Sequence, residues 1–141
     1  MTALRIVVVV IDLLVGFIAL TMAWKSLVAR RMLPFHEQSA GVAWDDIGPR
    51  FQQVLLALTR TVGLGFLVVG LLLLLAPALE YLGSGRWIVY AATASGAVYC
   101  AGLAVVNRTL ERETGPGTPW KGSLYAAVLL AVGLLLSAVA R

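Results

Sequence analysis

The sequence predicts an all-α membrane protein, a four-transmembrane-helix bundle with both chain ends outside and two cytoplasmic loops. Of its 141 residues, 60% are hydrophobic and only 13% are charged. A soluble domain of this size could not hide so much apolar surface, because part of every domain must face water. The apolar residues are also gathered into four separate runs. We therefore expect one integral membrane domain over residues 1–141.

Each apolar run is long enough to cross a bilayer as a helix. We place the spans at about residues 4–24, 61–79, 87–106 and 123–140, close to the ~20 residues that cross a hydrocarbon core of about 30 Å. Helices are required because the core offers no water to satisfy backbone groups. The first run is too long for a signal-peptide core and contains Asp12, so we expect a retained helix.

The segment between the first two spans, residues 25–60, is the largest polar feature. We expect the first helix to continue to Met32 and to end at Leu33–Pro34, because the residue before a proline disfavours the helical conformation. Residues 39–41 should form a loop. With Pro49 near its start, the next helix would run for about 46 Å and project beyond the bilayer.

The connection between the last two spans has the chemistry of helix ends. Residues 115–117 read Gly-Pro-Gly, and Thr118 could cap the final helix with Pro119 at its first position. The acidic residues of the two polar segments are expected to be solvated loop charges. They are Asp45, Asp46, Glu111 and Glu113.

Orientation follows from the basic residues. The segments after the first and third spans, with the adjoining helix ends, hold eight of the eleven Lys and Arg residues. Lysine and arginine are enriched on the cytoplasmic side of membrane proteins, which puts both polar segments inside and both chain ends outside. The residues expected at the inner interface, beside anionic lipid headgroups, are Lys25, Arg30, Arg31 and Arg60.

Arg60 allows two interpretations. If its helix entered the membrane near Phe51, Arg60 would lie deep and would need an acidic partner. If the span starts at Thr61, Arg60 lies at the inner boundary and its long side chain reaches the headgroups. The length of the helix favours the boundary position.

Asp12 is the most informative polar residue. It belongs to a face of small residues, since Gly16, Ala19 and Ala23 follow it at helical spacing, and such a face can pack closely against another helix. An ionised carboxylate in the bilayer core costs about 2.5–3.5 kcal/mol, so Asp12 should face protein or water.

Depth within the bilayer suggests the partners of Asp12. Thr93 and Ser95 of the third span lie nearest its level, and Tyr90 lies slightly above. Two roles remain open: a proton- or cation-handling site, or an interhelical hydrogen bond that fixes packing. The sequence favours the hydrogen bond, because no second charge accompanies Asp12.

The third span carries a ridge of small residues, Ala92, Gly96, Cys100 and Ala104, spaced four apart. Such ridges are typical of helix–helix packing. A second set of small residues in the last span makes self-association plausible, and we expect the ridge of the third span to contribute to it.

Several classes of function find no support. The chain has one cysteine and one histidine, His36, so it cannot form an intrachain disulfide or a His-rich metal site. No nucleophile–base constellation or phosphate-binding loop is present, and no basic cluster interleaved with aromatic residues suggests nucleic-acid binding. We expect no enzyme activity, cofactor or metal; a lipid-modifying enzyme built on residues 33–60 is the weakest alternative.

The leading hypothesis is a small non-catalytic protein of the inner (plasma) membrane of a bacterium. It would act as a homo-oligomer or as an accessory subunit of a membrane complex. The alternative is an ion- or proton-coupled transporter or channel that uses Asp12.

Overall fold

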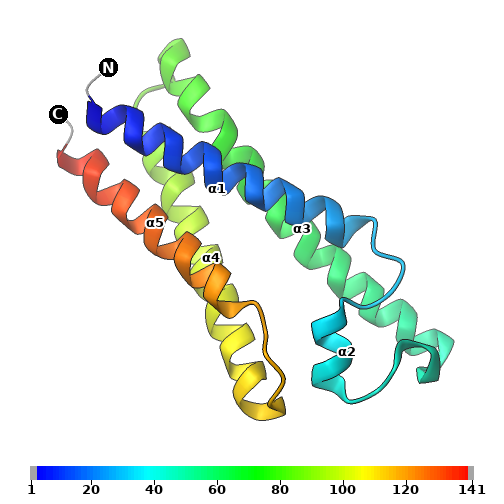
Figure 1. The fold of residues 1–141 in the computed structure, drawn as a ribbon. Coiled ribbons are helices and arrows are strands. Elements are labelled where there is room, and N and C mark those ends of the chain that lie inside the picture. The colour runs from blue at the N-terminus through cyan, green and yellow to red at the C-terminus, as the bar shows by residue number, and fades with distance from the viewer. Residues whose placement is uncertain (1–2, 140–141) are drawn as a thin grey trace.

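The computed structural model describes residues 3–139 and is all-helical over that range (Figure 1). Four helices are long and apolar enough to cross a membrane, so the predicted four-helix architecture is confirmed. The predicted sides of Met1 and Arg141, and the end of the fourth predicted span at Ala140, lie outside the described residues. The helices are α1 (Ala3–Leu27), α2 (Pro34–Ala40), α3 (Pro49–Leu79), α4 (Trp87–Thr114) and α5 (Trp120–Val139), with short helical turns η1 (Trp44–Asp46) and η2 (Glu80–Ser84).

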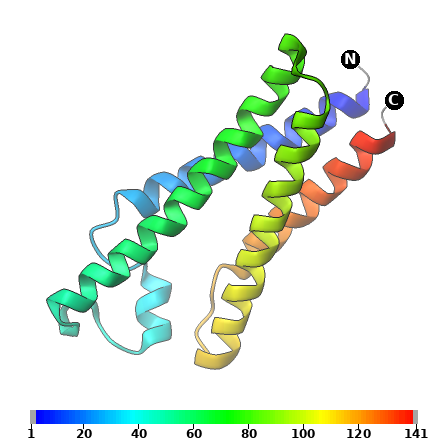
Figure 2. The same cartoon turned by 180° about the vertical axis from the view of Figure 1, so that it is seen from behind.

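The long helices form two antiparallel pairs, α1 with α3 and α4 with α5. The start of α1, the α3–α4 turn and the end of α5 share one end of the bundle, which we call the terminal end. From there the two pairs diverge toward the opposite end, the loop end, where the short helix α2 lies between them (Figures 1 and 2). Contacts between α1 and α5 and between α3 and α4 close the bundle.

Glycines allow α1 and α3 to approach closely. A Cβ atom on Gly70 would lie 2.8 Å from Leu20 Cδ2 and 3.1 Å from the carbonyl oxygen of Gly16. A Cβ atom on Gly63 would lie 2.9 Å from Ser26 Cβ. The predicted small-residue face of α1 therefore packs against another helix, and its partner is the leucine-rich α3, whose glycines the sequence reasoning overlooked.

The centre of the bundle is filled by Leu73 of α3 and Leu130 of α5, both 0% exposed. These side chains cover the middle of the small-residue ridge of α4: a Cβ atom on Gly96 would lie 3.1 Å from Leu130 Cδ1 and 3.3 Å from Leu73 Cδ1, and Cys100 belongs to the same buried cluster. All four ridge residues, Ala92, Gly96, Cys100 and Ala104, are buried within the chain. The ridge therefore packs against helices of its own chain in this conformation, and its expected contribution to self-association stays a prediction.

The link between α1 and α2 differs from the prediction. α1 ends at Leu27 rather than near Met32, and Pro34 starts a new helix, since a proline at the first helical position loses no backbone hydrogen bond. The predicted loop at residues 39–41 is also wrong for its first two residues. α2 continues to Ala40 and stops at Gly41, whose φ of 64° is left-handed and suits glycine.

The long helix α3 starts at Pro49, as predicted, and contains 31 residues. Gly48 is its N-cap. Asp45 and Asp46 belong to the separate turn η1, which precedes α3. The Gln52 side chain joins the two elements by donating a hydrogen bond to the Trp44 carbonyl oxygen, at 2.8 Å.

The turn between α4 and α5 is held by Glu111. Its carboxylate accepts hydrogen bonds from the Thr118 backbone N–H at 2.7 Å and from Trp120 Nε1 at 3.2 Å, and the Arg108 guanidinium lies 4.3 Å from the centre of the Trp120 ring. Glu111 thus lies in the last turns of α4 and not in a loop, and its partly exposed carboxylate is hydrogen-bonded to the turn. Thr118 likewise departs from its predicted capping role, since its hydroxyl donates to the Asn107 carbonyl oxygen at 2.8 Å.

The α1–α3 contact yields a matched test. Gly70→Ala should lower the free energy of unfolding by about 1–3 kcal/mol, because the new methyl group overpacks the crossing. Gly102→Ala is the control, since a Cβ atom there meets nothing within 4 Å. Reversible unfolding in mixed micelles would measure both variants. Equal effects would show that the close approach contributes nothing to stability.

Candidate functional site

The interior of the bundle contains one carboxyl group, that of Asp12, among the described residues. Asp12 is 0% exposed and points across the bundle from α1 to α4. There Thr93 Oγ1 lies 3.1 Å from Oδ1 and 3.0 Å from Oδ2 of Asp12. Thr93 is thus the predicted partner that the structure brings to Asp12.

The hydrogen bonds of Thr93 depend on whether the Asp12 carboxyl is protonated or ionised. Its Oγ1 atom also lies 2.8 Å from the carbonyl oxygen of Val89, and a hydroxyl group has only one proton to donate. If the Asp12 carboxyl is protonated, it donates to Thr93, and Thr93 donates to Val89. This arrangement serves both acceptors and buries no charge. A protonated carboxyl is thus one arrangement that fits these distances, and an ionised carboxylate that accepts the Thr93 proton is the other.

Ser95 and Tyr90, the other predicted partners, do not reach Asp12. Ser95 is exposed, because two residues along a helix correspond to a rotation of about 200°. Tyr90 lies nearer the terminal end, and its hydroxyl donates to the Ser137 carbonyl oxygen at 2.6 Å. Ser95 and Tyr90 were proposed only because they lie at a similar expected depth in the bilayer. They point in other directions around the α4 axis than Thr93 does.

A cluster of charges lies at the terminal end, above the Asp12–Thr93 pair. Glu80 of η2 accepts a hydrogen bond from Arg5 Nη2 at 2.8 Å, and Arg86 Nε is 3.9 Å from the same oxygen. Sequence reasoning missed Glu80, although it is the only acidic residue between Asp46 and Glu111. The cluster ties the start of α1 to the α3–α4 turn. Because its side chains are partly exposed, its contribution to stability is small.

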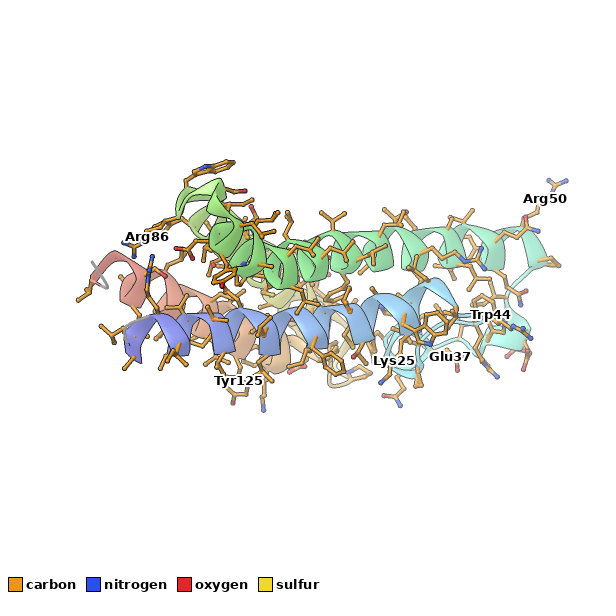
Figure 3. All side chains as sticks on the ribbon, turned by 90° about the horizontal axis from the view of Figure 1, so that it is seen from above. Lys25, Glu37, Trp44, Arg50, Arg86 and Tyr125 are labelled. Atoms are coloured by element: carbon orange, nitrogen blue, oxygen red, sulfur yellow. The ribbon has the colours of Figure 1, made fainter. Side chains whose placement is uncertain are left out.

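A cavity of about 370 Å³ lies beside this charge cluster. Its polar lining includes Arg86 and Tyr90, and its apolar lining includes Val8 and Val89. Figure 3 shows Arg86 at this end of the molecule. Because Val8 and Val89 each lie one helical turn before a member of the Asp12–Thr93 pair, the cavity ends about one turn from that pair.

On the other side of the pair, toward the loop end, the core is apolar. Val15, Leu73 and Leu130 belong to one buried cluster. The remaining buried polar side chains in the described range are Ser137 at the terminal end and Ser26 and Thr59 at the loop end. Buried polar side chains therefore provide no continuous path across residues 3–139.

The predicted inner-interface residues gather at the loop end. Arg31 Nη2 lies 3.2 Å from Glu37 Oε1, whereas Lys25 and Arg30 are exposed. Arg60 is also exposed. Since Gly63 faces Ser26 in the last turn of α1, Arg60 lies about one turn farther toward the loop end, and its place at the membrane boundary stays a prediction.

The remaining reactive side chains are scattered. Over the described residues, no group of three or more His, Cys, Asp or Glu side chains could hold a metal ion. Cys100 is a buried free thiol. The His36 ring lies 4.0 Å from the Phe35 ring, centre to centre, in a tilted arrangement, and partial burial lowers the pKa of its imidazole. None of these groups joins the Asp12–Thr93 pair.

The Asp12–Thr93 pair predicts the effect of one substitution. Thr93→Val keeps the side-chain shape but leaves the buried Asp12 carboxyl without its partner, which should lower the free energy of unfolding by about 1–3 kcal/mol. Thr61→Val is the control, because the exposed Thr61 hydroxyl bonds only within its own helix, to the Ala57 carbonyl oxygen. Unfolding in mixed micelles compares the two. Equal stability of both variants would contradict the role of this hydrogen bond.

Comparison with protein-family models, curated proteins and solved structures finds no match to this chain. Three features of the chain bear on its function: the buried Asp12–Thr93 pair, the charge cluster around Glu80 with its cavity, and the basic loop end.

Proposed function

We propose that this chain is a non-catalytic multi-pass membrane protein that acts as a subunit of a membrane assembly, either with copies of itself or in a larger complex. The observation that carries the proposal is the distribution of polarity. Only 22–33% of the most apolar part of each long helix is buried in the chain, whereas the interior holds the hydrogen-bonded Asp12. The outer faces carry large apolar side chains, including Phe17, Val98 and Leu135, which require lipid or other subunits to cover them.

The interior polar groups support a structural role. Asp12 is fully buried and bonded to Thr93, so in this conformation it presents no free atom to a substrate. The charges around Glu80 connect helices to one another in the same way. Since the middle of the α4 ridge is covered by the chain's own leucines in this conformation, contact with another subunit would use the outer faces.

The proposed orientation places the loop end in the cytoplasm, at the plasma membrane of a bacterium. Its support is the basic residues of the loop end, among them Lys25, Arg50 and Arg112, whereas Arg5 and Arg86 at the terminal end lie beside Glu80. A cysteine replacing Glu113 in a Cys100→Ala background should react with a membrane-impermeant reagent only from the cytoplasmic side. Labelling from outside would reverse the orientation.

Subunit stoichiometry tests the proposed assembly. Native mass spectrometry of the gently solubilised protein should show a defined homo-oligomer or a different protein bound at a fixed ratio. Asp12→Asn should leave that stoichiometry unchanged, because an amide N–H can replace the carboxyl proton as donor to Thr93. A uniform monomer without a protein partner would contradict the proposal.

A second function, ion- or proton-coupled transport through Asp12, is favoured by the cavity that ends one turn away. The apolar layer around Leu73 and Leu130 opposes it for a single chain, so a complete path would require an oligomer or a second conformation. Flux in reconstituted vesicles separates the two functions. Wild-type flux that is lost in Asp12→Asn would establish transport, and equal flux in both proteins would remove Asp12 from that role.

A further inference from the structure

We propose that a hollow at the loop end of α1 binds the headgroup of one anionic phospholipid molecule. The hollow has a volume of about 580 Å³. It forms where α1 stops at Leu27 and residues 28–33 leave the helix before Pro34 starts α2. The early end of α1, which the sequence did not predict, thus creates the concave surface.

The charges of the hollow favour an anion. Lys25, Arg30 and Arg31 line it together with one carboxylate, that of Glu37, so positive groups outnumber negative ones by two. Glu37 is paired with Arg31 at 3.2 Å. Within the described range, Lys25 and Arg30 have no ion pair, and their exposed side chains can reach a phosphate group. Figure 3 shows Lys25 and Glu37 near each other, with Arg50 at the far end of α3.

The apolar part of the hollow favours a lipid over a free phosphate ion. The buried Met32 contributes to its lining together with Val28 and Leu33. Trp24, which is 70% exposed, stands at its edge, and tryptophan is enriched at the level of lipid headgroups. A small hydrated anion would gain nothing from these surfaces.

The outer face of α1 carries exposed apolar side chains against which an acyl chain could pack. Val10, Phe17 and Trp24 follow one another at intervals of seven residues, which places them on the same helix face, and all three are exposed. A phospholipid with its phosphate at Lys25 and Arg30 could extend its chains along this face toward the terminal end. The inference rests on the proposed membrane location, and it adds a specific lipid as a ligand.

The experiment measures lipid binding to the full-length, delipidated protein in a neutral detergent. Phosphatidylglycerol and phosphatidylcholine are titrated separately, and bound lipid is counted by native mass spectrometry. Wild type should bind one phosphatidylglycerol with at least a ~10-fold preference over phosphatidylcholine. The double variant Lys25→Gln/Arg30→Gln should bind it about 10- to 30-fold more weakly, as expected for two cations near a headgroup.

A matched double variant, Arg50→Gln/Arg112→Gln, loses the same charge at exposed positions outside the hollow. It should keep wild-type binding. An equal loss in both double variants would assign binding to general surface charge and would overturn the proposed site. Displacement of phosphatidylglycerol by millimolar inorganic phosphate would overturn the lipid assignment and indicate a simple anion site.

Two controls distinguish the loss of the lipid site from misfolding of the variant and from a wrong membrane orientation. Unfolding in mixed micelles must show that Lys25→Gln/Arg30→Gln folds like wild type; if it does not, Lys25→Gln alone is measured and should weaken binding about 3- to 5-fold. Labelling of the Glu113→Cys protein tests the membrane orientation independently. Correct labelling without a lipid preference would overturn this inference and leave the proposed function standing.

Discussion

The hydrogen bond between Asp12 and Thr93 constrains the rest of the structure. A carboxyl group inside an apolar bundle must be bonded, because burial without a partner is costly. Its partner on α4 connects the α1–α3 pair to the α4–α5 pair and fixes how the two pairs are aligned along the bundle. Close packing surrounds the bond, because a Cβ atom on Gly16 would lie only 3.0 Å from Leu74 Cγ and 3.1 Å from Leu73 Cβ of α3.

The two ends of the molecule, on either side of this hydrogen bond, differ in the side chains that they contain. Beyond the bond, the terminal end holds the Glu80 charge cluster and its cavity, whereas Leu73 and Leu130 seal the core on the other side. The pairs diverge toward the loop end (Figure 2), where cations and the short helix α2 replace apolar packing. The interior is closed by the chain's own side chains, and the exterior is apolar; both features are compatible with the proposed role in a membrane assembly.

The sequence predicted most of the features that depend on local spacing. The four helices, the start of α3 at Pro49 and the small-residue face of Asp12 all follow from patterns within one segment. Thr93 was identified from depth, but Ser95 was not separated from it, because rotation about α4 depends on packing. Glu80 was missed, and the hydrogen bonds of Glu111 were not predicted, because each carboxylate acts through residues that only the folded chain brings near. The α4 ridge was recognised, whereas the leucines that cover it come from two other helices.

A double-mutant cycle on Asp12 and Thr93 tests the account most directly. The free energies of unfolding of wild type, Asp12→Ala, Thr93→Val and the double variant are measured in the same mixed micelles. We expect the two substitutions to be coupled by about 1 kcal/mol, in the range measured for interhelical hydrogen bonds in membrane proteins. Additive effects, with a coupling below about 0.3 kcal/mol, would show that the bond does not hold the two helix pairs together.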